Sequence, residues 1–253
     1  MNVMAVIPAR YGSTRFPGKP LTPLAGKPMV QHVYERVKQA ARVSRVVVAT
    51  DDERVLRAVA DFGGEAVATR SDHRSGTERM AEVAAGPAGA AAEVFVNVQG
   101  DEPLIHPAAI DAAVEAVVSD SSVSAATLCV PIASPADLMN PDVVKVVLDF
   151  QGDALYFTRA PVPWVRDENP QVRVQHWKHL GLYVYRRDLL LEFPTLPPGT
   201  LEKIEQLEQL RLLENGYKIR VVETEHDSIG VDTPEDAARV EKLLQEVDAS
   251  GAA

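Results

Sequence analysis

The stretch PARYGSTRFPGKP occupies residues 8–20 and directly follows an apolar run, Val3 to Ile7, which we expect to form a buried strand. Its two glycines and three prolines are incompatible with a continuing helix, so we predict an ordered loop at the strand end. The loop carries Arg10, Arg15 and Lys19, although the whole chain has a net charge of −10. Glycine-containing turns let backbone N–H groups approach an anion, which the cations then neutralise, so the loop predicts a phosphate-binding site. A solvated basic surface loop is the alternative.

The spacing of the glycines excludes the common P-loop of nucleotide-binding proteins. That motif places four residues between its two glycines and continues with Lys and then Ser or Thr, whose hydroxyl binds magnesium. Here five residues separate Gly12 from Gly18, and Pro20 follows Lys19. A magnesium ligand must therefore come from another part of the chain.

Strand and helix patterns alternate along much of the chain. Strands are predicted at apolar runs over residues 45–50, 65–69, 94–98 and 219–223. Helices are predicted between and after them, at 30–41, 52–62, 77–85, 106–118, 201–213 and 234–247. This alternation is typical of an α/β protein with a doubly wound, mostly parallel sheet.

The pattern changes after Pro131, where strands at 143–148 and 180–185 are separated by a proline-rich stretch without a helix pattern. We predict that residues 132–186 form a smaller antiparallel insertion, and that residues 1–131 and 187–248 form the α/β domain. Residues 249–253 are expected to be a disordered tail. We expect three apolar residues of the insertion to be exposed and to suit a subunit interface: Phe157, Val162 and Trp164.

Composition limits the possible classes of function. With 36 acidic against 26 basic residues, the chain has no positive excess for non-specific binding to nucleic acid or a membrane surface. The single cysteine, Cys129, excludes an intrachain disulfide and lies in an apolar run, where we expect it to be a core residue. No apolar stretch is long enough to span a bilayer, and Arg10 and Arg15 interrupt any signal-peptide pattern. We therefore expect a cytoplasmic protein.

A series of motifs follows the opening loop in a fixed order. They are PARYGSTRFPGKPL (8–21), GKPM (26–29), SGTER (75–79), NVQGDEP (97–103), VKVVLD (144–149), ALYFTRAPVPW (154–164), HLGLYVYR (179–186), LEQLRLLENG (207–216) and GVDTPED (230–236). Together they resemble the 3-deoxy-manno-octulosonate cytidylyltransferase family of sugar-activating nucleotidyltransferases, from about Val3 to Leu244. Each motif alone is weak, and their joint order makes the resemblance specific.

The resemblance implies a Mg²⁺-dependent transfer of CMP from CTP to the anomeric hydroxyl of 3-deoxy-D-manno-octulosonate (Kdo). Pyrophosphate would leave, and the product would feed lipopolysaccharide biosynthesis. The resemblance also implies a homodimer in which the α/β domain binds the nucleotide and the insertion contributes to the sugar site.

Two carboxylates are candidate magnesium ligands. Asp101 lies just after a buried strand, where open α/β sheets bind ligands, and the family's metal position matches it rather than the adjacent Glu102. Asp232 precedes the last helix, but Thr233 stands directly before Pro234 and is the better cap. Asp232 is therefore left to face a metal, although a turn residue and a helix cap are the ordinary alternatives for the pair.

The remaining candidates follow from the loop and from the resemblance. Arg10 and Lys19, with Asp101 and Asp232, are the expected catalytic residues. The nucleotide would be bound by Pro8, Ala9, Arg10, Gly12, Ser13, Arg15, Lys19, Arg74, Ser75 and Gln99, whereas His73 is interpreted as a surface-loop histidine. The sugar would be bound by Gln99, Arg159, His179, Tyr183, Glu205, Glu208 and Gln209, with the Arg159 guanidinium suited to a sugar carboxylate.

Three other readings compete with this one. A sister transferase would activate sialic acid or another acidic sugar, and the sequence does not show the shape of the pocket. A catalytically silent nucleotide-binding module would have lost the metal carboxylates, and both candidates are present. A glycosyltransferase would want an Asp-X-Asp pair after a strand, which Gly100-Asp101-Glu102 does not supply.

Overall fold

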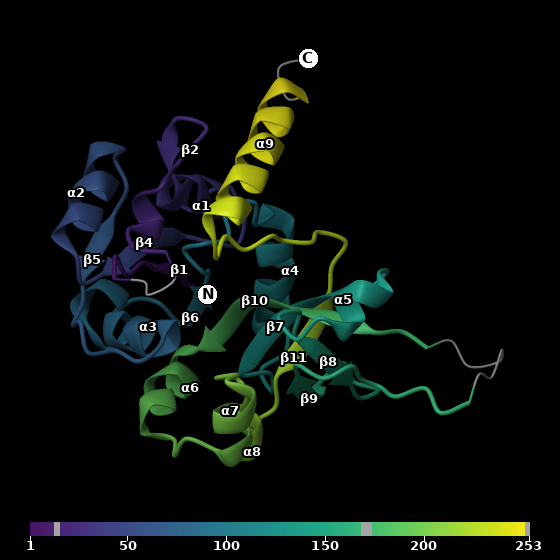
Figure 1. The fold of residues 1–253 in the computed structure, drawn as a ribbon. Helices are drawn as coiled ribbons and strands as arrows, with labels where there is room; N and C mark the ends of the chain where they lie inside the picture. The colour runs from purple at the N-terminus through teal and green to yellow at the C-terminus, as the bar shows by residue number, and fades with distance from the viewer. Residues whose placement is uncertain (13–15, 168–173, 251–253) are drawn as a thin grey trace.

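A central sheet with helices on both faces forms the body of the protein in the computed structural model, which describes residues 1–12, 16–167 and 174–250 (Figure 1). Its strands lie in the order β11 (Arg220–Glu223), β7 (Ala125–Pro131), β10 (Trp177–Arg186), β6 (Val94–Asn97), β1 (Val3–Pro8), β4 (Arg45–Thr50) and β5 (Ala66–Ala68). β10 is antiparallel to its neighbours β7 and β6, and the other neighbouring pairs are parallel. The predicted doubly wound, mostly parallel sheet is confirmed.

The helices connect these strands. They are α1 (Met29–Val37), α2 (Glu53–Asp61), α3 (Gly76–Ala85), α4 (Pro107–Val118), α5 (Pro135–Met139), α6 (Arg187–Glu192), α7 (Thr200–Glu205), α8 (Leu210–Glu214) and α9 (Pro234–Ser250). Short 3-10 helices occur at η1 (Lys19–Leu21), η2 (Pro87–Gly89) and η3 (Phe193–Thr195). Across the described ranges, none of these helices has the length and apolar character needed to cross a membrane.

Strand β1 contributes to the core on both faces of the sheet, because successive side chains of a strand point to opposite sides. Val3, Ala5 and Ile7 pack with α1, α2 and α4 on one face. Met4 and Val6 pack with α3 and α6 on the other. All five are buried, which explains why a central parallel strand appears in the sequence as an unbroken apolar run.

Side-chain caps fix where the helices begin. Asp52 accepts a hydrogen bond from the Arg54 N–H at the start of α2. At the start of α9, the Thr233 hydroxyl accepts from the Asp236 N–H, and the Asp236 carboxylate accepts from the Thr233 N–H. This reciprocal pair confirms Thr233 as the cap and places Asp232 outside it.

Helix α9 returns to the beginning of the chain. It packs on the hairpin of β2 (Pro23–Leu24) and β3 (Lys27–Pro28), where Leu24 and Met29 meet Val240 and Leu244. α9 extends to Ser250, so residues 249 and 250, which were predicted to be part of a tail, are helical. Residues 251–253 lie outside the described part.

The insertion differs from the prediction in its strands. Its own sheet portion is the antiparallel pair β8 (Lys145–Leu148) and β9 (Ala154–Thr158), and β9 and the short α5 were not predicted. The strand predicted at 180–185 is part of β10, which lies inside the central sheet and pairs with β8 only at Trp177 and Lys178. Trp164 is 82% exposed, as expected, and Val162 is partly exposed. The expectation for Phe157 is wrong, because it is buried against the core and is not available to a partner.

The predicted helix 201–213 is wrong, because two short helices replace it. Gln206 adopts a left-handed conformation (φ 55°) that ends α7, and α8 begins four residues later. Leu207 and Leu210 are buried, whereas Leu201 and Ile204 are exposed. The break changes the direction of the chain at residues 206–209, within the segment assigned to sugar binding.

Lys145 stabilises the insertion through three hydrogen bonds to backbone carbonyls. Its side chain is fully buried and donates hydrogen bonds to the backbone carbonyls of Asn140, Val143 and Arg159, at 2.8, 2.7 and 2.7 Å. Burial, reinforced by the nearby Arg159, lowers the pKa of Lys145. The three carbonyls join the start of β8 to the chain that leaves β9.

Replacing Lys145 should therefore destabilise the protein. Lys145→Met keeps most of the volume but removes the donor from three carbonyls, of which only that of Asn140 retains another donor within the described part of the chain, the Val143 N–H. We therefore expect a loss of about 3 kcal/mol in the free energy of unfolding. Urea unfolding measures this, with the exposed Lys203→Met as the matched control. A loss no larger than that of the control would show that the carbonyls find other donors.

Candidate active site

A cavity of about 300 Å³ opens where the carboxyl ends of β1 and β6 meet. Its wall comes from the end of β1, from η1, from the loop before α3 and its first turn, from the end of β6 and from the residue before the α9 cap. The lining residues are Pro8, Ala9, Arg10, Lys19, Pro20, His73, Arg74, Ser75, Gly76, Arg79, Gln99, Gly100, Asp101 and Asp232. This is the edge of an open α/β sheet where ligands bind.

Two glycines let the elements come close enough to form the cavity. A Cβ atom on Gly100 would lie 2.8 Å from the Pro8 carbonyl oxygen, so a side chain there would push β6 away from β1. A Cβ on Gly76 would lie 3.2 Å from Cγ of Pro8. The ends of both strands and the start of α3 therefore meet at Pro8.

The structure brings together most of the predicted nucleotide residues. Those that line the cavity are Pro8, Ala9, Arg10, Lys19, Arg74, Ser75 and Gln99. Gly12 does not line it, and Ser13 and Arg15 lie outside the described residues. The loop is closed by a 3.0 Å hydrogen bond from the Gly18 N–H to the Tyr11 carbonyl, and Gly18 has a φ of 77°, which favours glycine.

Lys19 bridges the two candidate metal carboxylates. Its Nζ lies 2.5 Å from Oδ2 of Asp101 and 3.0 Å from Oδ1 of Asp232, and its side chain is only 13% exposed. A 2.8 Å hydrogen bond from the Val231 N–H to the Asp101 carbonyl joins the same two segments. Burial alone would lower the pKa of Lys19, but Asp101 and then Asp232 raise it. The loop therefore places a buried, charge-paired ammonium here rather than a solvated one.

This arrangement fits a hard divalent cation. Oxygens from residues 101 and 232 converge on one positive group, and carboxylate oxygens are the protein ligands that Mg²⁺ prefers. Among the residues described, no group of three or more His, Cys, Asp or Glu side chains is placed to hold a metal. Two carboxylates suit Mg²⁺, which usually keeps waters and takes its remaining ligands from phosphates.

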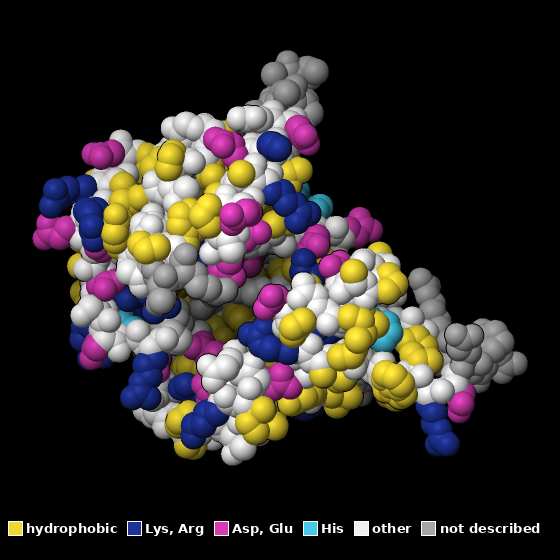
Figure 2. Space-filling model, in the orientation of Figure 1, with side chains coloured by type: hydrophobic (Ala, Val, Ile, Leu, Met, Phe, Trp, Pro, Cys, Tyr) yellow, Lys and Arg dark blue, Asp and Glu magenta, His cyan; other side chains and the backbone are white. Residues whose placement is uncertain are grey.

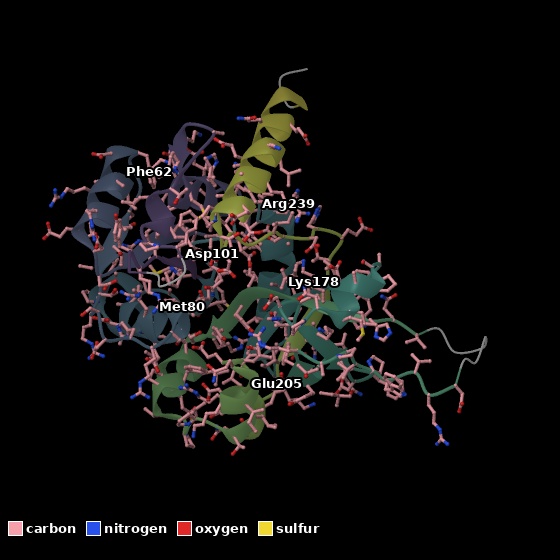
Figure 3. All side chains as sticks on the ribbon, viewed as in Figure 1. Phe62, Met80, Asp101, Lys178, Glu205 and Arg239 are labelled. Carbon is pink, nitrogen blue, oxygen red and sulfur yellow. The ribbon has the colours of Figure 1, made fainter. Side chains whose placement is uncertain are left out.

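Glu205 and Arg159, both predicted to bind sugar, hold each other and the insertion. The Glu205 carboxylate accepts hydrogen bonds from the Thr158 hydroxyl at 2.6 Å and from the Arg159 N–H at 3.0 Å. The Arg159 guanidinium donates to the carbonyls of Glu205 and Pro141, at 2.9 and 3.0 Å. Figure 3 shows Asp101 near the first turn of α9 and Glu205 well below it on α7.

His179 and Tyr183 are buried. Nε2 of His179 is 2.9 Å from the Thr127 hydroxyl, and its ring meets Phe157 edge-on. Burial lowers the pKa of His179 to about 3, so the ring is neutral at physiological pH. Gly181 does leave room on this strand, but the space is taken by Gln99 and Glu102, whose atoms lie 3.8 and 3.4 Å from the position of a Cβ.

Glu208 and Gln209 lie between the break in the predicted helix and α8. Burial raises the pKa of Glu208, and hydrogen bonding from the Ser75 and Thr77 hydroxyls opposes this. Nε2 of Gln209 is buried and has no hydrogen-bond partner within the described ranges. A buried, unpaired amide of this kind indicates a polar ligand or a water molecule.

Several functional candidates were missed from the sequence. Gly76, Arg79 and Gly100 line the cavity without having been predicted to do so. His73, interpreted as a surface-loop histidine, also lines it, and its side chain is only 6% exposed. Its position directly before Arg74 and Ser75 was the available signal.

Glu102 is a further buried acid beside Asp101. Its Oε2 is buried and makes no hydrogen bond with the described residues. Burial, followed by the repulsion of Asp101, raises the pKa of Glu102 to about 7. The carboxyl therefore exchanges its proton close to neutral pH.

Comparison with known proteins agrees with this geometry. The family model described as cytidylyltransferase matches residues 4–219. The 3-deoxy-manno-octulosonate cytidylyltransferase of Solibacter usitatus is 55% identical over 244 residues, which is 96% of this chain and 95% of the relative. The enzyme of that name from Geobacter sulfurreducens is 54% identical over 98% of this chain and 100% of its own length.

Two solved structures are also similar. CMP:2-keto-3-deoxy-manno-octonic acid synthetase complexed with CTP superposes with a TM-score of 0.91 and is 45% identical, covering 97% of this chain and 99% of its own. A cytidylyltransferase from Leptospira borgpetersenii has a TM-score of 0.65, covers 97% of this chain and 87% of its own, and is 17% identical, so it supports the fold alone.

The raised pKa of Glu102 predicts a pH-dependent stability. Between its ordinary value of 4.5 and about 7, the folded state holds a proton that the unfolded state has lost, so stability falls as pH rises through this range. The loss should reach about 3 kcal/mol above pH 7, and Glu102→Gln should remove it. Urea unfolding at pH 5 and pH 8 checks this. An equal change with pH in both proteins would contradict the prediction.

Proposed function

Because the chain belongs to the 3-deoxy-manno-octulosonate cytidylyltransferase family, we propose that it transfers CMP from CTP to the anomeric hydroxyl of Kdo, with release of pyrophosphate. It is a nucleotidyltransferase by this membership. The observation that carries the proposal is Lys19 between Asp101 and Asp232, at the mouth of a cavity lined by the phosphate loop. Full-length similarity to proteins named for this reaction supports the choice of base and sugar.

Arg10 and Lys19 supply positive charge at the end of β1, where the loop exposes its backbone to the cavity. Cations fixed in place before the reaction stabilise the negative charge that develops on a leaving pyrophosphate. Lys19 also holds the two carboxylates at one point before any ligand binds. Mg²⁺ bound by Asp101 and Asp232 would neutralise phosphate charge and lower the pKa of the attacking hydroxyl.

Arg159 is the proposed partner of the sugar carboxylate. Two backbone carbonyls fix its guanidinium, and they do not neutralise its charge. The unpaired Gln209 amide adds a hydrogen-bond donor that a sugar hydroxyl or carboxylate would satisfy. His179 is neutral and held by Thr127, so we assign it to the shape of the pocket rather than to proton transfer.

The same proposal includes the oligomeric state, the cellular location and the pathway. A homodimer would cover apolar side chains such as Trp164, and the space-filling view shows apolar side chains gathered at lower right, toward the insertion (Figure 2). We further propose a cytoplasmic enzyme that supplies lipopolysaccharide assembly, because CTP is a cytoplasmic substrate and Kdo is a lipopolysaccharide sugar.

Substrate identity is tested by measuring pyrophosphate release with CTP, UTP, ATP and GTP against a panel of acidic sugars that includes Kdo and sialic acid. We expect pyrophosphate release above background only when CTP is combined with Kdo. All other pairs of nucleotide and sugar should give the same background. Equal or faster release with sialic acid would replace Kdo with that sugar. Absence of release with every pair would favour a silent nucleotide-binding module.

The two carboxylates are tested as a unit. Asp101→Asn and Asp232→Asn keep size but remove charge, so each variant should need more Mg²⁺ and lower kcat by roughly 10²-fold or more. The double variant should be little worse than either single variant, because the same ion is lost only once.

The control for this pair is Asp236→Asn, which changes the α9 cap, including the hydrogen bond from the Asp232 N–H, but leaves both metal carboxylates and Lys19 in place. Its Mg²⁺ requirement should match that of the parent. Normal Mg²⁺ dependence in Asp232→Asn, measured by titration of activity, would remove that residue from the metal site.

A further inference from the structure

One wall of the cavity is a loop that two glutamates of α3 hold in place. The Glu78 carboxylate accepts a hydrogen bond from the Arg74 N–H at 2.9 Å, and Glu82, one helical turn later, accepts from the Arg70 N–H at 3.0 Å. Both acceptors lie on one face of the helix. The loop is therefore shaped before a ligand arrives.

Glu82 also fixes the ring of His73. The same oxygen that accepts from the Arg70 N–H is hydrogen-bonded to Nε2 of His73. Burial alone would raise the pKa of Glu82, but these two hydrogen bonds lower it, so the carboxylate is ionised and only accepts. Nε2 of His73 must then be the ring nitrogen that carries the proton.

The proton on Nε2 determines whether Nδ1 of His73 is a hydrogen-bond donor or an acceptor. In a neutral imidazole with Nε2 protonated, Nδ1 is a hydrogen-bond acceptor. Nδ1 of His73 makes no hydrogen bond with the described part of the chain, and the residue lines the cavity. The wall thus presents an acceptor to a ligand.

The Arg79 guanidinium, a hydrogen-bond donor on the same wall, is already bonded to other groups of the protein. Arg79 is 4% exposed, and its guanidinium donates to the Thr69 hydroxyl and to the Arg70 carbonyl and pairs with Asp51 at 3.1 Å. Its hydrogen bonds are directed at the protein. His73 is therefore the side chain of this wall that is set to recognise a ligand donor.

We propose that His73, positioned by Glu82, accepts a hydrogen bond from the exocyclic amino group of the nucleotide base and so selects cytosine over uracil. This rests on the proposed function, in which the triphosphate lies at Lys19 and the base would contact the loop wall that carries His73. Cytosine presents an amino donor where uracil presents a carbonyl oxygen. An acceptor facing that oxygen is left unpaired, so the preference for CTP should be at least tenfold.

The test measures binding of CTP and of UTP to the intact protein by calorimetry, without turnover. His73→Gln keeps a polar group at the Nε2 position for Glu82 but removes the Nδ1 acceptor, so the CTP preference should fall about tenfold. His73→Asn places an amide oxygen near the Nδ1 position and should retain most of the preference. Glu78→Gln, the matched control, perturbs the same loop without touching His73 and should weaken both nucleotides equally.

Nitrogen-15 NMR of the ring adds a readout that a purely structural role would not move. The ligand-free protein should show the Nε2–H tautomer, and the Nδ1 resonance should shift with CTP and not with UTP. An Nδ1–H tautomer, or an unchanged CTP preference in His73→Gln, would overturn the inference while leaving the proposed function intact. Equal binding of CTP and UTP by the parent protein would also overturn the inference, whereas the proposed function is decided separately by the pyrophosphate-release assay.

Discussion

The site depends on holding two negative charges from distant parts of the chain at one point. Asp101 and Asp232 are 131 positions apart in the sequence, and like charges at short range repel strongly in a partly desolvated cavity. Lys19 offsets that repulsion, and the hydrogen bond from Val231 to Asp101 fixes the two segments. The α9 cap then removes the competing use of Asp232, since Thr233 and Asp236 satisfy the helix end. The chain itself thus supplies the cation that holds the two carboxylates together.

The strand ends set where this pair lies. β1 and β6 are neighbours in the sheet, and only a glycine at position 100 lets the chain leaving β6 pass the Pro8 carbonyl. The opening loop leaves the end of β1, so Arg10 and Lys19 reach the same edge of the sheet as Asp101. The antiparallel strand β10 runs beside β6 and brings Gly181 against Gln99 and Glu102. The geometry of the sheet therefore places the phosphate and metal candidates next to one another, together with Gln99 from the sugar candidates.

Much of this was predictable, and the failures have physical causes. Alternating apolar runs gave the parallel strands, and the order Thr233-Pro234 identified the α9 cap, because both signals are local. The break at Gln206 was not predictable, because a non-glycine residue in a left-handed conformation has no local signal and is imposed by packing. The place of β10 in the central sheet is a non-local pairing, so its apolar pattern could not separate it from the insertion. His73 was missed because its contact with Glu82 is made across a loop and a helix.

The two halves of the site differ in charge, and this follows from burial. Around Lys19 the groups are paired ions, and Asp101 and Asp232 raise the pKa of Lys19, which stabilises its charge. On the sugar side no such ion pairing offsets burial, which disfavours the charged forms of His179 and Glu208. His179 is neutral with a pKa of about 3, and the pKa of Glu208 is raised. Glu205 is the exception. Burial would raise its pKa, but hydrogen bonds from the Thr158 hydroxyl and the Arg159 N–H lower it, so an ionised carboxylate lies beside Arg159. In the proposed function, a sugar acid would therefore meet this carboxylate as well as the fixed guanidinium.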